Sequence, residues 1–105
     1  MSMPALSAPP AEARPFDPDY TACFSVHAGV DPGVMPRVME LFAKRGLVPT
    51  SWHSRVGGLR DDELVIDIQM QGMVYREAEY VAACLRQIPD VVIVLTSERF
   101  RAAAE

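Results

Sequence analysis

The side chains most able to support chemistry in this chain of 105 residues are two histidines and two cysteines. His27 falls on the polar side of a predicted strand, where an imidazole can bind a ligand or transfer a proton, although a solvent-exposed histidine would give the same pattern. His53 directly follows Trp52, so the two side chains point to opposite faces of their predicted strand. Cys23 and Cys84 are too few and too far apart for a disulfide framework or a zinc site. We expect no metal, no cofactor and no catalytic residue.

A short loop, Asp31-Pro32-Gly33, is the second candidate because it leads into a predicted helix. The first amides of a helix have no partner within the helix, and they favour anions such as a carboxylate. Gly33 would let a ligand or another backbone approach closely. A tight turn that caps the helix explains the same residues without a ligand, so both interpretations stay open.

The elements that must position these residues follow from hydrophobic periodicity. Alternation predicts strands over 20–28, 47–56 and 63–71, and a nearly continuous apolar run predicts a strand over 91–96. Three- and four-residue spacing predicts helices over 34–45 and 75–88. This βαββαβ order is typical of the α+β, ferredoxin-like sandwich, an antiparallel four-stranded sheet with two helices on one face. Right-handed crossovers then place the first and third strands in the middle of the sheet.

Proline and glycine refine these boundaries. With Gly33 as the N-cap, Pro36 becomes the third helical residue and loses no hydrogen bond. Gly46 is the natural residue just past the helix C-terminus. Pro49 predicts an edge position or a bulge for the second strand. The last strand, 91–96, is almost continuously apolar, so we expect it to be central or buried on both faces.

We expect a single domain, because 105 residues are too few for two cores. Proline and alanine dominate residues 1–19, which predicts a disordered arm, followed by the domain over 20–97 and a C-terminal tail over 98–105. The apolar runs are too short to cross a bilayer, and no signal peptide is evident, so we expect a cytoplasmic protein without a membrane partner. So small a core also favours self-association.

Several activities known for this fold class are excluded by missing residues. The loop over 30–33 holds neither a thiol pair for a metal nor an arginine for a phosphate. No nucleophile-elbow motif is present and the two histidines fall in different predicted strands, so a serine-protease triad is not indicated. The third strand presents Val65, Asp67 and Gln69 where RNA-recognition motifs present aromatic residues, and the net charge is −4. We therefore expect no nucleic-acid partner.

The first strand, the Asp-Pro-Gly turn and the first helix form one continuous motif from Phe24 to Val48. Its helix reads Arg-Val-x-x-Leu-Phe-x-x-Arg-Gly, at Arg37, Val38, Leu41, Phe42, Arg45 and Gly46. This motif resembles the opening of an ACT domain, most closely that of the small regulatory subunit of acetohydroxyacid synthase (acetolactate synthase). The segment 85–94 is similar to the second helix and last strand of that family, so the resemblance spans about residues 20–97.

The resemblance implies a non-catalytic regulatory module of branched-chain amino-acid biosynthesis. It implies a homodimer or higher assembly, a catalytic large subunit as partner, and an amino-acid effector bound between two copies. The first loop of one copy and the start of the second strand of its neighbour would hold that effector. The matching residues here are Val30, Asp31, Pro32, Gly33, Val34, Val48 and Pro49.

Two positions depart from the valine-responsive members of that family. They carry an asparagine in the first loop and another after the glycine that ends the helix, where this chain has Val30 and Val48-Pro49. One alternative is therefore a stand-alone ACT sensor that selects a less polar ligand. Another is a small dimeric α+β-barrel enzyme, with His27, Trp52 and His53 as candidate residues.

Overall fold

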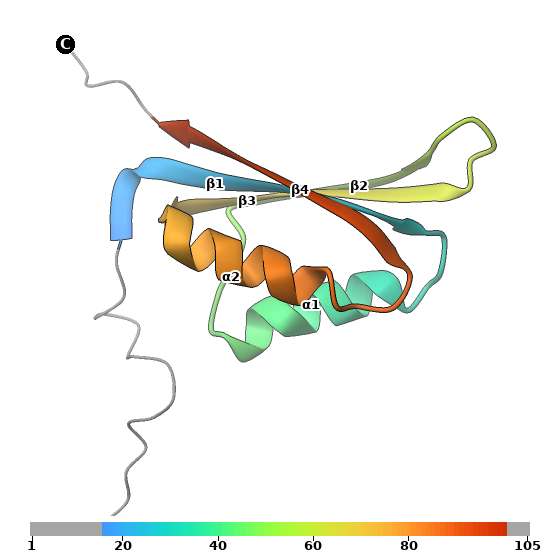
Figure 1. The fold of residues 1–105 in the computed structure, drawn as a ribbon, viewed down its shortest axis with the longest axis horizontal. Coiled ribbons are helices and arrows are strands. Elements are labelled where there is room, and N and C mark those ends of the chain that lie inside the picture. Colours follow the sequence, from blue (N-terminus) through green and yellow to red (C-terminus); the bar gives the residue numbers. More distant parts are fainter. Residues whose placement is uncertain (1–15, 101–105) are drawn as a thin grey trace, which may run out of the picture.

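A computed structural model describes residues 16–100 of the chain. Its elements are β1 (Phe16–Gly29), α1 (Val34–Lys44), β2 (Ser51–Gly57), β3 (Glu63–Met73), α2 (Tyr75–Leu85) and β4 (Val91–Phe100). The four strands form one antiparallel sheet in the order β2-β3-β1-β4. Both helices lie on the same side of this sheet (Figure 1). The predicted ferredoxin-like fold is confirmed, with the first and third strands in the middle.

The core lies between the helices and one face of the two central strands. Alternate residues of β1 and β3 point into it, and the register places Phe24 opposite Ile68. The ring of Phe24 meets the ring of Phe42 from α1 edge to face, with centroids 6.2 Å apart. The other fully buried large side chains are Val26, Val34, Val38, Ile66, Val81 and Leu85.

Helix α1 begins and ends where its glycines predict. Gly33 is the N-cap, and Pro36 is the third helical residue. At the other end, the amide of Gly46 donates to the carbonyl of Ala43 at 3.0 Å and the amide of Leu47 donates to that of Phe42 at 2.9 Å. These two bonds form a Schellman motif. Gly46 has a φ of 70°, which the motif requires and glycine adopts at no steric cost.

Replacement of Gly46 by alanine is expected to lower the free energy of unfolding by about 1 kcal/mol, because the side chain disfavours a positive φ. Urea denaturation measures the loss. Gly57→Ala is the matched control, because Gly57 lies in a strand without a positive φ and an added Cβ meets nothing within 4 Å. Equal losses in the two variants would contradict this account of the helix end.

Two elements are shorter than the sequence predicts. Strand β2 starts at Ser51 rather than at residue 47, because Pro49 interrupts the segment. Thr50 takes over part of the pairing: its amide donates to the carbonyl of Gln69 at 2.8 Å, and its hydroxyl accepts the amide of Gln71 at 2.7 Å. Helix α2 ends at Leu85, three residues early, and turns connect it to β4.

The first and last strands run further than the sequence predicts. β1 starts at Phe16, and its register against β3 shifts between Phe16 and Thr21, where the side chain of Gln71 donates to the carbonyl of Pro18. β4 continues to Phe100, so residues 98–100 belong to the sheet and not to a tail. The hydroxyl of Tyr20 on β1 donates to the carboxylate of Glu98 on β4, and this bond raises the pKa of Tyr20. The remainder of the predicted arm and tail, 1–15 and 101–105, lies outside the described residues.

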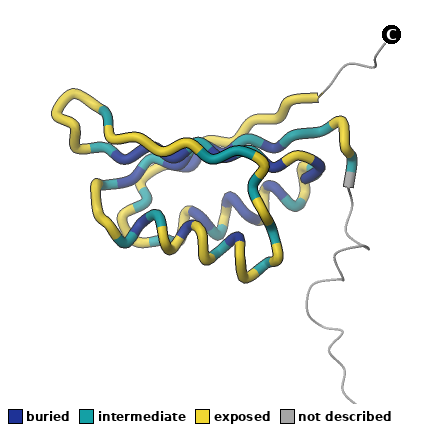
Figure 2. The backbone as a smooth tube through the Cα atoms, turned by 180° about the vertical axis from the view of Figure 1, so that it is seen from behind, coloured by how far each residue is buried: buried dark blue, intermediate teal, exposed yellow. Residues whose placement is uncertain are grey.

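The prediction that the last strand is buried on both faces is wrong. β4 is an edge strand that pairs only with β1, and Val94 is its single buried residue. Val92, Ile93 and Leu95 are 74%, 48% and 57% exposed. Figure 2 shows β4 and the loop between β2 and β3 as largely exposed. The apolar run therefore marks an uncovered edge.

Candidate functional site

The loop between β1 and α1, together with the first residue of α1, holds five of the seven residues that the resemblance assigns to an effector. Asp31 folds this loop: its Oδ1 accepts the amide of Gly33 at 2.7 Å, and its carbonyl accepts the amide of Val34 at 3.1 Å. Val30 and Pro32 are exposed, but Val34 is fully buried. The side chain of Val34 therefore packs the core and does not line a ligand site.

These bonds change the expected chemistry of the loop. Because the amides of Gly33 and Val34 already bind Asp31, a ligand carboxylate would have to displace it. The carboxylate of Asp31 itself is exposed, and a negative charge attracts an ammonium group rather than a carboxylate. The loop is therefore better suited to the cationic end of a ligand.

The other two predicted site residues lie elsewhere. Val48 and Pro49 follow the C-terminus of α1, whereas the loop precedes its N-terminus. Eleven helical residues span about 16 Å. Val48 is 83% exposed. One chain therefore does not bring the two parts of the predicted site together.

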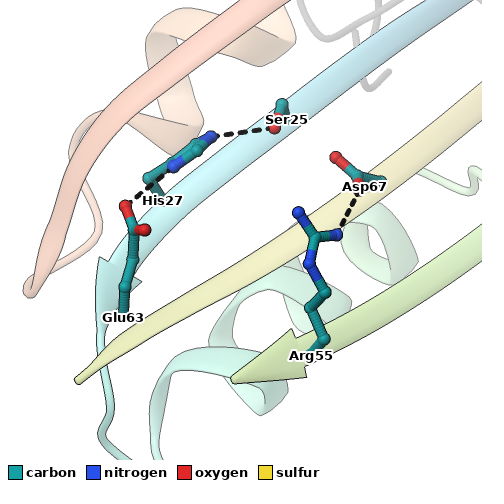
Figure 3. A network of polar contacts seen from close by, with 5 residues as sticks. All are labelled: Ser25, His27, Arg55, Glu63 and Asp67. Atoms are coloured by element: carbon teal, nitrogen blue, oxygen red, sulfur yellow. Dashed lines mark hydrogen bonds and ion pairs between the residues drawn. The ribbon is translucent and has the colours of Figure 1, made fainter. Parts of the chain in front are cut away.

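The sheet face opposite the helices carries a polar cluster that the sequence did not indicate. The Oγ of Ser25 lies 3.0 Å from Nε2 of His27, and Nδ1 of the same imidazole lies 2.9 Å from Oε2 of Glu63 (Figure 3). Nearby, Arg55 and Asp67 form a separate ion pair at 3.1 Å. Ser25 and His27 come from β1, and Glu63 is the first residue of β3.

A cavity of about 490 Å³ lies beside this cluster. His27 and Glu63 line it on the polar side, and Leu59, Val92 and Ile93 supply apolar walls. Leu59 and Val92 are strongly exposed, so the cavity is wide open to solvent. Its volume is within the range of small-molecule sites.

The structure does not assemble the residues of the predicted barrel enzyme. His53 pairs with Asp67 on the sheet face opposite the helices, where β3 separates it from His27 on β1. Trp52 pairs with Ile68 on the helix side and packs against the core. The prediction that Trp52 and His53 point to opposite faces is confirmed, but the three residues form no common site.

Residues 16–100 hold neither a cluster of metal-binding side chains nor a helix that could span a membrane. No group of three His, Cys, Asp or Glu side chains in this range is placed to hold a metal ion. None of the helices in the described part is long and apolar enough to span a membrane.

The fold and the exposed first loop define a class: a small α+β module of ferredoxin-like topology. Residues 17–102 match the family model of the ACT-like domain. The chain therefore belongs to the ACT-like domain family, whose members are typically regulatory ligand-binding modules. No curated protein matches this chain.

Solved structures share this fold at low sequence identity. The ACT domain from GTP pyrophosphokinase of Chlorobium tepidum superposes with a TM-score of 0.62 and 11% identity, over 75% of this chain and 99% of that domain. The C-terminal domain of the MgtC protein from Mycobacterium tuberculosis gives 0.61 and 18%, over 85% and 97%. The regulatory subunit of aspartate kinase from Thermus flavus gives 0.58 and 18%, over 82% of this chain and 54% of that one.

Proposed function

We propose that this chain is a non-catalytic regulatory subunit that acts on a biosynthetic enzyme, with the acetohydroxyacid synthase large subunit as the specific partner. The match of residues 17–102 to the ACT-like family carries the regulatory part of the proposal. The helix motif from Arg37 to Gly46, which resembles the small subunit of that synthase, supports the choice of partner. The action would be conformational: the module stabilises one state of the enzyme, and an effector shifts that balance.

A second copy would complete the effector site. Antiparallel packing of α1 against the same helix of a partner copy places the N-terminal end of one helix beside the C-terminal end of the other. The loop at Asp31 would then face Val48 and Pro49 of the second copy, closing the distance that separates them in one chain. Asp31 would bind the ammonium group of the effector, and exposed Val30 and Val48 would contact its apolar part.

This arrangement assigns a different role to β4. The copy that completes the effector site lies on the α1 and β2 side, so β4 at the opposite edge stays uncovered. Its unpaired backbone groups and the exposed Ile93 and Leu95 are suited to contact with the large subunit. By contrast β2 is short and carries the exposed polar residues His53, Ser54 and Arg55, so it is less suited than β4 to strand pairing with the large subunit.

Co-purification from the native host tests the proposal. The full chain with a C-terminal tag, purified at low salt, is expected to retain a stoichiometric acetohydroxyacid synthase large subunit, quantified by mass spectrometry. A purification from an untagged host sets the background. Recovery of the chain alone, as a homodimer, would contradict the choice of partner and favour the second candidate.

That second candidate is a stand-alone sensor of a small ligand. The apolar and exposed Val30 and Val48, at positions where the synthase subunits carry asparagine, favour it. A thermal-shift panel of amino acids and keto acids on the purified chain tests it. A stabilising ligand for a chain that does not retain the large subunit supports the sensor, and no shift across the panel contradicts it.

A further inference from the structure

The polar cluster on the open sheet face has the arrangement of an activated serine. Ser25 and His27 are two residues apart on β1, so their side chains lie on the same face. The hydroxyl is within hydrogen-bond distance of one ring nitrogen of His27, at 3.0 Å, and the Glu63 carboxylate is within that distance of the other, at 2.9 Å. A nucleophile, a base and a group that orients the base are therefore in contact in that order.

The chemistry of the three groups fixes the direction of the hydrogen bonds. An ionised carboxylate only accepts, so Nδ1 of His27 carries the hydrogen that Glu63 receives. In the neutral imidazole Nε2 is then an acceptor, and the Ser25 hydroxyl donates to it. This is the tautomer in which a histidine can take a proton from a serine.

The cavity beside the cluster suggests which electrophile fits. His27 and Glu63 line it, and its walls include Leu59, Val92 and Ile93. Ser25 lies two strand residues from His27, about 7 Å along β1. Ser25 itself does not line the cavity, so an acyl chain attached to the serine would extend past His27 toward it. We propose that Ser25 is a covalent acceptor for acyl groups, taken from esters or thioesters that carry a short apolar chain.

The step is a simple acyl transfer. A bond forms between Oγ of Ser25 and the acyl carbon while the hydroxyl proton moves to Nε2 of His27. The bond from the acyl carbon to the leaving oxygen or sulfur then breaks, and His27 returns the proton to the leaving group. Glu63 remains ionised and stabilises the imidazolium in between. The products are a serine ester and a free alcohol or thiol.

The surroundings limit how fast this site reacts. At Ser25, β1 pairs with β3 at Asp67 and with β4 at Leu95. The backbone amides there belong to the sheet ladders, so they do not form an oxyanion hole. On the same face Arg55 binds Asp67, and Arg99 binds Gln69. The rate gain therefore comes from the base alone, about 10²–10⁴-fold. The serine ester is an alkyl ester and therefore a less reactive acyl donor than an aryl ester or a thioester, so the adduct accumulates and the site is one of modification, not of turnover.

The test is reaction of the purified full chain with p-nitrophenyl butyrate, followed by nitrophenolate release and by mapping of the adduct by mass spectrometry. We expect one butyryl group per chain, on Ser25, and none there in Ser25→Ala. His27→Gln should slow acylation by at least 100-fold and Glu63→Gln by about tenfold.

Two other residues on the same sheet face serve as controls. Ser97 is an exposed serine on the same face, and His53 is an exposed histidine there without a serine partner among the described residues. Ser97→Ala and His53→Gln should react at the unchanged rate. Equal acylation in His27→Gln, or a butyryl group on Ser97 as readily as on Ser25, would overturn the proposal. Circular dichroism of each variant confirms that the fold is kept, and none of these outcomes depends on the proposed partner enzyme.

Discussion

Replacement of Phe42 by alanine is expected to lower the free energy of unfolding by about 3–5 kcal/mol. Phe42 is 1% exposed, and its ring packs edge to face against Phe24 at the centre of the core. The substitution removes a large apolar group from the contact between α1 and the sheet and leaves a cavity behind. Globular proteins gain about 0.05–0.15 kcal/mol per residue on folding, so a domain of this size can lose much of its stability. Urea denaturation followed by circular dichroism measures the loss.

Phe100→Ala is the control for this prediction. Phe100 also meets a ring edge to face, that of Tyr20 at 5.5 Å, but it is 64% exposed. We expect its loss to cost less than about 1 kcal/mol, because little apolar surface returns to water. If the two variants lost equal stability, the ring contact rather than burial would be the source of the effect.

The second large effect concerns the proposed partner. The double variant Ile93→Lys with Leu95→Lys should reduce capture of the large subunit by at least 100-fold. Full burial of such a side chain contributes about 1.5–3 kcal/mol, and charges on an edge strand oppose pairing. Both residues are substantially exposed in the free chain, so the variant should fold normally. Co-purification with quantitative mass spectrometry measures the capture.

Ser54→Lys with Val56→Lys places the same two charges on the opposite edge strand, β2. This control should keep the large subunit, whereas size-exclusion chromatography with light scattering should show weaker self-association. The β4 variant, Ile93→Lys with Leu95→Lys, should lose the large subunit and keep its self-association. Loss of the large subunit in both variants, or in neither, would contradict the assignment of separate edges to the two partners.

Hydrophobic periodicity and the positions of glycine and proline were sufficient to predict most of this fold. Alternation in β3, the apolar stripe of α1 and the two glycines at its ends are local signals, and the structure confirms each of them. The position of β4 was predicted inconsistently. The predicted topology placed β4 at an edge of the sheet, whereas its apolar run indicated burial. The apolar run is the weaker guide, because an edge strand that contacts a partner is apolar as well.

The polar cluster could not be predicted because it depends on register. His27 and Glu63 lie in different strands, and they meet only because Gly29 pairs with Glu63 at the end of the β1–β3 ladder. A shift of the β1–β3 register by one residue would turn the polar side chains of one strand to the other face of the sheet. The alternating pattern predicted which face His27 occupies but not which carboxylate would reach it.

The pairing of β1 with β4 also decides when this protein can fold. β1 is synthesised before β4 and pairs with it, for example at Phe24 and Thr96, so the sheet cannot close before β4 has been made. Contacts so distant in sequence slow folding, because the loop between them must be ordered first. Until β4 has been made, one side of β1 stays unpaired, so a nascent chain that lacks β4 is prone to aggregate.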